Sequence, residues 1–448
     1  MYQRLSHRCF GLAQKTIIVK SSMAQRALII TLGCRLNHAD TALLSARLKN
    51  AGYELCSSCA EKPDLIVLNS CAITAEAERK SRQQIRKLRK AHPSARIAVA
   101  GCAAELAPEK FLECGADITF TNPDKKLFPT APTGVNSREI PFENFAEKSL
   151  SEFPFRTRAF IKIQEGCDNF CSYCIVPYVR GASRSRKFAE CIADCQHAID
   201  AGFPEIVFTG VNTCNYFDDG KDLIALIREV AALPGNFRIR LSSTEPHPDD
   251  LSIPELMADP ASKLCRFLHL SMQHGSDPVL AAMRRNYTSG QFIDFVTNVR
   301  ALVPDIHIGS DFIIGFPGET EADFIRLLEV VNTVKFANIH PFAYSIRPGT
   351  PAAVMPGQVP AMIVKQRMKL LADAAGNAAV DFARSQLGKT LPVIFEQEKN
   401  NILHGWSDNY LSICVPSGSF PTGKIVNIKA DEKNLAENLQ KNLSDGIL

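Results

Sequence analysis

Short apolar runs alternate with helix-length segments along most of this chain, and that repetition limits the choice of fold more than any other property. The first runs are Ala27–Leu32, Asp64–Leu68, Arg96–Ala100 and Ile118–Thr121. They are rich in Ile, Val and Leu and lack strict apolar–polar alternation, which is typical of parallel strands buried on both faces. Residues 26–125 are therefore predicted to form a doubly wound α/β domain around a parallel sheet.

A second series of apolar runs lies within residues 154–385. The runs are Ala159–Ile163, Glu205–Thr209, Arg238–Ser242, Phe267–Met272, Ile306–Ile314 and Asn338–Tyr344. Amphipathic segments such as Cys191–Ala201 separate them, so the pattern is that of repeated βα units. Six such units predict a partial (β/α)6 barrel with helices outside, and functional groups in such folds gather at the carboxyl ends of the strands.

The rest of the chain divides by composition. The polar, proline-containing residues 126–153 are predicted to be a linker. A helix is expected over Ala361–Leu387, and the runs Thr390–Phe395, Ser407–Val415 and Lys424–Ile428 predict a small β-barrel and tail within residues 386–448. Residues 1–25 contain bases and no acid, which is typical of an organelle transit peptide or of an extension upstream of a true start at Met23.

Bulk properties exclude several classes of protein. No run of about eighteen apolar residues occurs, so a membrane span is not expected. The net charge of +4 does not by itself indicate a nucleic-acid partner. Fifteen cysteines, an odd number without an apolar signal sequence, argue for metal ligands and buried thiols rather than a disulfide framework. We expect a cytoplasmic protein, or an imported one if residues 1–25 belong to the native chain.

Three cysteines, Cys167, Cys171 and Cys174, follow the first run of the second series at C-x₃-C-x₂-C spacing. Three thiolates on one loop can hold a [4Fe–4S] cluster and leave its fourth iron open to a small molecule. A closed zinc site needs a fourth ligand, and no Cys or His follows within the next dozen residues. The spacing predicts an iron–sulfur site, with zinc or buried thiols as the alternatives.

Three further cysteines, Cys34, Cys71 and Cys102, each follow a predicted strand of the first domain. The carboxyl ends of parallel strands meet at one edge of a sheet, so these thiols are expected to converge on a second open cluster site. Small buried thiols are also common near strand ends, and position alone does not decide between the two interpretations. The pair Cys56 and Cys59 has C-x₂-C spacing but no second pair nearby, so we expect it to be structural.

Polar residues at other strand ends are candidate cofactor contacts, although each could be ordinary strand-end chemistry. They are Thr209, Gly210, Asn212, Glu245 and Gln273. Residues 79–90 hold seven bases and no acid, and Arg180, Arg184, Arg186 and Lys187 form a second basic stretch. Both stretches suit a phosphate backbone, with a solvated surface as the alternative. The candidate RNA-binding residues are Arg79, Lys80, Arg82, Arg86, Arg89 and Trp406, the last by stacking on bases together with Tyr410.

The cysteine loop, with Tyr173 before its last cysteine, resembles the radical S-adenosylmethionine superfamily. The segments Thr31–Asn37, Asn69–Thr74 and Gly101–Ala103 are similar to the signature of the methylthiotransferase family within it, and the likeness runs from Arg26 to about Ile428. It implies two [4Fe–4S] clusters on the six cysteines, S-adenosylmethionine, a reducing electron donor, and a C-terminal RNA-binding module called TRAM. The chain departs from the family at Cys214, where a glycine is usual.

The resemblance also implies a reaction. One S-adenosylmethionine methylates a sulfur held at the second cluster, and another yields a radical that abstracts hydrogen from an unactivated C–H bond. The segments Thr31–Asn37 and His269–Gln273 are most similar to the branch that acts on threonylcarbamoyladenosine beside the tRNA anticodon. The sister branches, on isopentenyladenosine or on a ribosomal-protein aspartate, remain alternatives, as does a non-enzymatic iron–sulfur RNA-binding or sensor protein. The resemblance leaves the sulfur source open.

Overall fold

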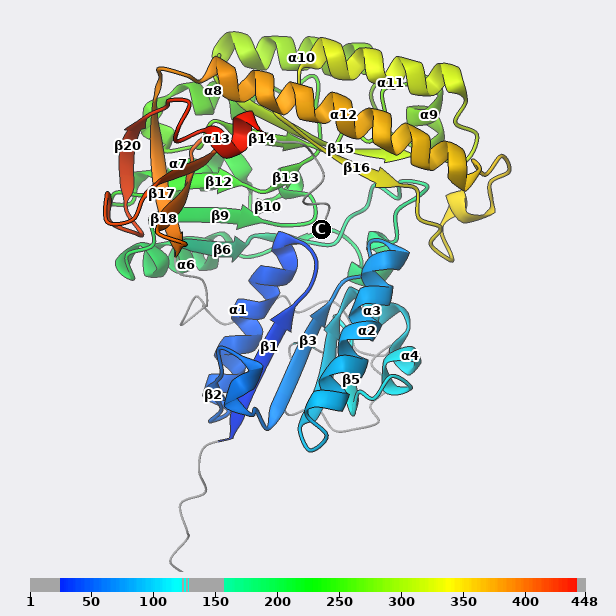
Figure 1. Cartoon of the computed structure of the whole chain (residues 1–448), viewed down its shortest axis with the longest axis vertical. Helices are drawn as coiled ribbons and strands as arrows, with labels where there is room; N and C mark the ends of the chain where they lie inside the picture. Colours follow the sequence, from blue (N-terminus) through cyan, green and yellow to red (C-terminus); the bar gives the residue numbers. More distant parts are fainter. Residues whose placement is uncertain (1–24, 123–124, 126–127, 129–156, 441–448) are drawn as a thin grey trace, which may run out of the picture.

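The computed structural model describes residues 25–122, 125, 128 and 157–440. An N-terminal parallel sheet lies against a larger central unit of parallel strands, and an antiparallel sheet near the C-terminus lies beside that unit (Figure 1). The predicted extension and linker fall outside the described residues, apart from residues 25 and 128. Within the described part of the chain, no helix is both long enough and apolar enough to cross a bilayer.

The N-terminal domain is a five-stranded parallel sheet in the order β2-β1-β3-β4-β5, covered by helices on both faces. Leu44 and Leu48 pack on one face, and Ile85 and Leu88 on the other. This confirms the predicted doubly wound parallel sheet. Its elements are β1 (Arg26–Thr31), α1 (Arg35–Asn50), β2 (Glu54–Leu55), β3 (Leu65–Ser70), α2 (Ala75–Ala91), β4 (Arg96–Gly101), α3 (Cys102–Leu106), α4 (Pro108–Leu112) and β5 (Ile118–Phe120).

The central unit holds two parallel sheets, one in the order β12-β9-β6 and one in the order β13-β14-β15-β16. A parallel bridge between Ile239 and Leu264 joins β12 to the segment that leads into β14, and each of the predicted runs of the second series forms a strand. The strands are β6 (Arg158–Lys162), β9 (Glu205–Thr209), β12 (Arg238–Leu241), β13 (Ser243–Thr244), β14 (Phe267–Leu270), β15 (His307–Ile314) and β16 (Asn338–Ala343).

Helices cover one face of these strands, with α10, α11 and α12 lying together across the outside (Figure 1). The helices are α5 (Val176–Arg180), α6 (Phe188–Asp200), α7 (Leu223–Ala232), α8 (Ser252–Ala258), α9 (Asp277–Ala282), α10 (Ser289–Leu302), α11 (Glu321–Val334) and α12 (Ala361–Ser385). Two short antiparallel pairs, β7 (Gln164–Glu165) with β8 (Arg184–Ser185) and β10 (Phe217–Asp218) with β11 (Lys221–Asp222), lie in the connections.

The opposite face of the central strands, which we call the inner face, is polar. Alternate residues such as Ile206, Leu268 and Ile308 pack in the core beneath the helices. Because side chains alternate along a strand, their neighbours Glu205 and His269 lie on the inner face. The inner face is therefore the part of this unit whose chemistry suits a polar ligand.

The C-terminal segment forms an antiparallel sheet in the order β19-β18-β17-β20. Its elements are β17 (Thr390–Lys399), β18 (Ile402–Ser407), β19 (Ser412–Pro416), β20 (Ile425–Lys429) and α13 (Ala436–Leu439). The predicted single strand over Ser407–Val415 is wrong. Residues 408–411 form a turn, because Ser407 Oγ accepts a hydrogen bond from Leu411 N at 2.8 Å and Tyr410 adopts a left-handed φ of 62°.

Candidate active site

The cluster-loop triad (Cys167, Cys171 and Cys174) lies between β7 and α5. Gly166 enters the loop with a φ of 74°, and a Cβ there would come within 1.9 Å of the Ala182 carbonyl oxygen, so the turn requires glycine. Cys171 is buried and the other two are half-buried. Burial raises the pKa of the Cys174 thiol to about 12, with the neighbouring Cys171 and Cys167 thiols adding to the rise. The three sulfur atoms therefore share one small region.

The sheet-edge triad (Cys34, Cys71 and Cys102) comes from the carboxyl ends of β1, β3 and β4, which are adjacent strands in parallel register. A Cβ at Gly33 would lie 2.6 Å from the Cβ of Cys71, so this glycine lets the first loop approach the second. Burial, then the thiols of Cys34 and Cys102, raise the pKa of Cys71 to about 12. The sheet thus brings the three predicted cysteines together.

The chemistry of both triads suits an iron–sulfur cluster, because each offers three thiols whereas a closed structural zinc site needs a fourth ligand. Thiolates also gain from hydrogen-bond donors around a cluster. Arg285 Nη1 lies 3.4 Å from Cys171 Sγ, and Arg180 Nε lies 3.1 Å from Cys102 Sγ. The residues present therefore fit iron–sulfur clusters.

Arg180 connects the two triads. It ends α5, directly after the cluster loop, and its side chain is 3% exposed. Its guanidinium lies 2.5 Å from Glu165 and 2.7 Å from Asn37 Oδ1, in addition to the contact with Cys102. Asp40 on α1 completes this buried network through Lys125 and Lys162, at 2.6 Å and 2.8 Å. Three cations around Asp40 hold its pKa well below the usual range despite its burial. The network fixes the first domain against the central unit.

A second polar group surrounds Glu245, which follows β13. Asn212 donates to Glu245 Oε2 at 2.8 Å, Arg285 contacts Oε1 at 2.9 Å, and Asn169 of the cluster loop also donates to this carboxylate. Two predicted cofactor contacts, Asn212 and Glu245, are thereby brought beside the cluster-loop triad. A carboxylate held by three donors at this position suits recognition of hydroxyl groups on a nucleoside.

The other predicted contacts have varied surroundings. Gly210 lies against the Gln164 side chain, whose Oε1 accepts from Val211 N and Asn212 N at 2.9 Å each. Thr209 is buried and donates to the Val207 carbonyl. Gln273 has a φ of 72° where its backbone bridges to Phe312. Tyr173 packs with an apolar cluster that includes Phe316, near Arg285 of the Glu245 group.

The first predicted basic stretch lies on α2, and several of its bases have protein partners. Arg79 pairs with Glu76, Arg82 with Glu78, and Arg89 with Asp117. Arg89 also donates to the Gly115 and Ala95 carbonyls, so its position is structural. The exposed bases on this helix are Arg79, Lys80, Arg86, Lys87 and Lys90.

The second predicted basic stretch is wrong as a phosphate-binding surface. Arg180 and Arg186 are buried, and Arg186 pairs with Asp194 at 2.8 Å. Arg184 is half-buried near Glu165, and the exposed Lys187 pairs with Asp218 at 3.0 Å. Sequence alone missed this outcome because the acidic partners of Arg180 and Arg184 lie on other elements.

The remaining predicted residues are placed as follows. The Trp406 ring stacks on Tyr410 with ring centres 4.8 Å apart, and the Arg158 guanidinium lies 5.9 Å from the centre of each ring. Cys56 and Cys59 are half-buried free thiols, outside any three-ligand group of the described residues. Five further free cysteines are buried or half-buried, namely Cys191, Cys195, Cys214, Cys265 and Cys414.

Comparison with known proteins places these observations in a family. The Radical SAM superfamily model matches residues 161–331, and the model of Uncharacterized protein family UPF0004 matches residues 26–121. The chain is 35% identical to the threonylcarbamoyladenosine tRNA methylthiotransferase MtaB of Bacillus subtilis (strain 168), over 89% of this chain and 92% of that protein. It is 34% identical to the tRNA-2-methylthio-N(6)-dimethylallyladenosine synthase of Cereibacter sphaeroides (strain ATCC 17023), over 91% of this chain and 96% of that protein.

A solved structure shares the fold. The radical S-adenosylmethionine methyltransferase TsrM from Kitasatospora setae superposes with a TM-score of 0.56 at 15% identity, over 74% of this chain and 75% of that one. The chain belongs to the methylthiotransferase family of radical S-adenosylmethionine enzymes. It is thus an enzyme whose cofactors are two [4Fe–4S] clusters and S-adenosylmethionine.

Proposed function

We propose that this enzyme inserts a methylthio group at C2 of N6-threonylcarbamoyladenosine beside the tRNA anticodon. The observation that carries the proposal is its similarity, at 33–35% identity over 86–90% of the chain, to three proteins that bear this activity in their names. The two cysteine triads, joined through Arg180, supply the two cluster sites that such an activity needs. We propose that the enzyme acts on its tRNA substrate in the cytoplasm.

We also propose a finer description of the fold. The six principal parallel strands of the central unit, with helices on one face and a polar inner face, form the partial (β/α)6 barrel expected from the sequence. The C-terminal antiparallel sheet is a TRAM-like RNA-binding module. Its position supports this role, since Arg238 donates to the Pro392 and Trp406 carbonyls at 2.9 Å and 3.0 Å and so fixes it to the catalytic unit.

The cluster-loop triad would hold the cluster that binds S-adenosylmethionine, and the sheet-edge triad would hold the other. When bound, these groups supply the radical and the methylthio group, which an unactivated C–H bond requires because it offers neither an acidic proton nor a leaving group. Arg285 orients the loop by contacting both Cys171 and Glu245. Glu245 and Asn212 are positioned to bind ribose hydroxyls, with Gln273, Thr209, Gly210 and Tyr173 shaping the same strand ends.

For RNA binding, we propose the exposed bases of α2 rather than its paired arginines. Four of these bases are exposed, namely Lys80, Arg86, Lys87 and Lys90. The guanidinium groups of Arg82 and Arg89 instead donate hydrogen bonds to acceptors within the protein. Mobile exposed cations can neutralise phosphates without first breaking an internal ion pair. Trp406, in the C-terminal sheet, would add an aromatic surface for stacking at a separate part of the RNA-binding face.

A second candidate substrate is isopentenyladenosine in tRNA. The specific observation in its favour is the similarity to the Cereibacter sphaeroides synthase, at nearly the same identity as the MtaB proteins. The names of the relatives therefore agree on the methylthiolation reaction but differ on which N6 substituent the substrate adenosine carries. Discrimination must come from residues that touch that substituent.

The test offers the reconstituted holoenzyme three substrates in parallel: threonylcarbamoylated tRNA, isopentenylated tRNA and ribosomal protein. S-adenosylmethionine, dithionite as electron donor and sulfide as sulfur source are supplied, and products are measured by mass spectrometry. We expect a mass gain of one methylthio group in place of hydrogen on the threonylcarbamoylated tRNA. Modification of the isopentenylated tRNA alone would assign the sister branch, and modification of the protein alone would refute an RNA substrate.

A further inference from the structure

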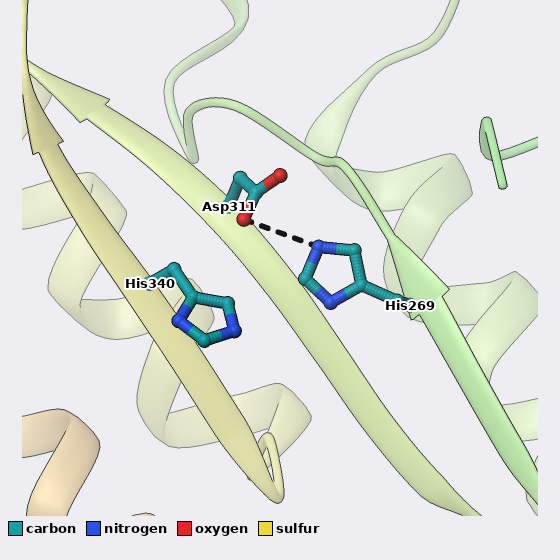
Figure 2. Close-up of side chains that lie close together, drawn as sticks. All are labelled: His269, Asp311 and His340. Carbon is teal, nitrogen blue, oxygen red and sulfur yellow. Dashed lines mark ion pairs between the residues drawn. The ribbon is translucent and has the colours of Figure 1, made fainter. Parts of the chain in front are cut away.

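Two histidines and an aspartate converge on the inner face of three adjacent strands (Figure 2). His269 comes from β14, Asp311 from β15 and His340 from β16, and we call them the inner-face trio. His269 Nε2 lies 3.1 Å from Asp311 Oδ1, and the two imidazole ring centres are 5.5 Å apart. Gly309, the partner of His269 in the sheet, leaves room for the ring, since a Cβ there would lie 3.0 Å from His269 Nδ1.

A short series of hydrogen bonds connects the trio to the candidate cofactor site. Asp311 Oδ2 lies 3.3 Å from Ser271 Oγ, and the Ser271 carbonyl accepts a hydrogen bond from Arg285 Nη2 at 3.1 Å. Arg285 in turn contacts Cys171 of the cluster loop. A molecule that touches the trio would therefore sit within reach of chemistry at the strand ends.

The opposite side of the trio is bounded by a positively charged floor. Phe267, two residues before His269 on the same strand, packs on Tyr410 with ring centres 4.8 Å apart. Burial and the Glu205 carboxylate would raise the pKa of the Tyr410 phenol, yet Arg35, Arg158 and Arg240 together lower it below its usual value. The Arg35 and Arg240 guanidinium groups lie 5.3 Å and 4.9 Å from the centre of the Tyr410 ring, and this gathering of cations favours an anionic ligand nearby.

The trio is open on the side away from the helices. His269 is buried, Asp311 is partly exposed, and His340 is exposed. His269 and Ser271 each contact one Asp311 oxygen, and a carboxylate oxygen can accept a further hydrogen bond. The exposed imidazole of His340, whose Nε2 lies 3.0 Å from Asn338 Nδ2, faces the same space. The group thus presents imidazole donors and a carboxylate acceptor to one ligand.

We propose that the inner-face trio binds the N6 substituent of the substrate adenosine and recognises its carboxylate, urea and hydroxyl groups. The inference rests on the proposed function and names the residues that select the base. His340 donates to the substituent's carboxylate, His269 holds the Asp311 carboxylate in place, and Asp311 accepts from the N–H or O–H donors of the substituent. An apolar isopentenyl group would displace water from the trio and offer no hydrogen bonds in its place. A site whose polar groups are left unpaired by the wrong substrate discriminates strongly against that substrate.

The test uses His340→Gln and Asp311→Asn variants of the full-length holoenzyme. The substrates are tRNA anticodon stem-loops that carry threonylcarbamoyladenosine or its methyl ester, in which the carboxylate is neutral. The wild type should prefer the acid, and each variant should lose about 10- to 100-fold in kcat/KM on the acid, with a smaller loss on the ester. The matched control is His197→Gln at an exposed position of α6, which should match the wild type on both substrates.

The possible failures can be told apart. A wild type that modifies neither stem-loop refutes the proposed function, and the subsite with it. A wild type that modifies acid and ester equally well refutes the subsite alone, as do variants that lose the same factor on both. A zinc or manganese ion retained by the wild type, lost from His340→Gln and required for activity, would assign the trio to a metal and overturn direct recognition.

Discussion

Replacing Glu205 by Gln should strongly destabilise the enzyme while preserving the shape of the side chain. Glu205 begins β9 and is fully buried. Its carboxylate lies 2.6 Å from Arg238, 3.0 Å from Arg240 and 3.4 Å from Arg158. An amide has no charge to offset these guanidinium groups, so the variant leaves buried cations less compensated.

The expected loss follows from that burial. Removing one partner of a buried ion network costs roughly 3–5 kcal/mol, because the remaining charges stay desolvated. Residues 157–385 form a unit of the size for which 1 kcal/mol shifts the unfolding midpoint by roughly 2–4 °C, so the midpoint should fall by about 6–20 °C. Arg238 and Arg240 also bind C-terminal carbonyls, including Trp406 and Asp408, so that sheet should loosen as well.

The assay is anaerobic thermal unfolding of the holoenzyme at a fixed scan rate, combined with limited proteolysis of the C-terminal sheet. The matched control is Glu329→Gln on α11, where an exposed carboxylate lies 3.0 Å from Arg326. An exposed pair contributes little, so this control should lie within about 2 °C of the wild type. A Glu205→Gln midpoint equal to that of the control would refute the reasoning.

The same carboxylate predicts a pH dependence. Burial would raise the pKa of Glu205, but Arg240, Arg238 and Arg158 hold it well below the usual 4.5. A lowered folded-state pKa gives stability that is present above about pH 4.5 and is lost as the pH falls further. The difference in midpoint between the wild type and Glu205→Gln should therefore narrow below about pH 4.5. A difference in unfolding midpoint that widens below about pH 4.5 would contradict the conclusion that Glu205 is ionised in the folded enzyme.

Three further predictions concern the clusters and the RNA. Anaerobically reconstituted protein should hold roughly eight irons, and alanine at the whole cluster-loop triad should leave about half, whereas four irons in the unmodified chain would exclude the second site. Alanine at the whole sheet-edge triad should preserve S-adenosylmethionine cleavage and abolish methylthio transfer, and a loss of cleavage with the first cluster intact would contradict separate roles. Glutamate at Arg86, Lys87 and Lys90 should weaken tRNA binding and flatten its salt dependence at unchanged iron content, and an unaltered salt slope would exclude α2 from the RNA interface.

Local spacing was enough to predict the cluster-loop triad, because its three cysteines span one loop. The sheet-edge triad needed one more step, the rule that parallel strands end at a common edge. Buried apolar runs marked those strands reliably, since each central strand is shielded on both faces. The C-terminal turn at residues 408–411 was missed, because the hydrogen bonds of Ser407 and the left-handed Tyr410 interrupt a run that looks continuous.

By itself, the amino-acid sequence determined the strand and helix pattern, the two cysteine triads and the family. Only the tertiary structure decided which charges are exposed and which hold the domains together. Arg180 looks like a surface base until Glu165, Asn37 and Asp40 enclose it. The inner-face trio likewise comes from three separate strands. The physical reason is that a side chain's charge and burial depend on partners that only folding brings into contact.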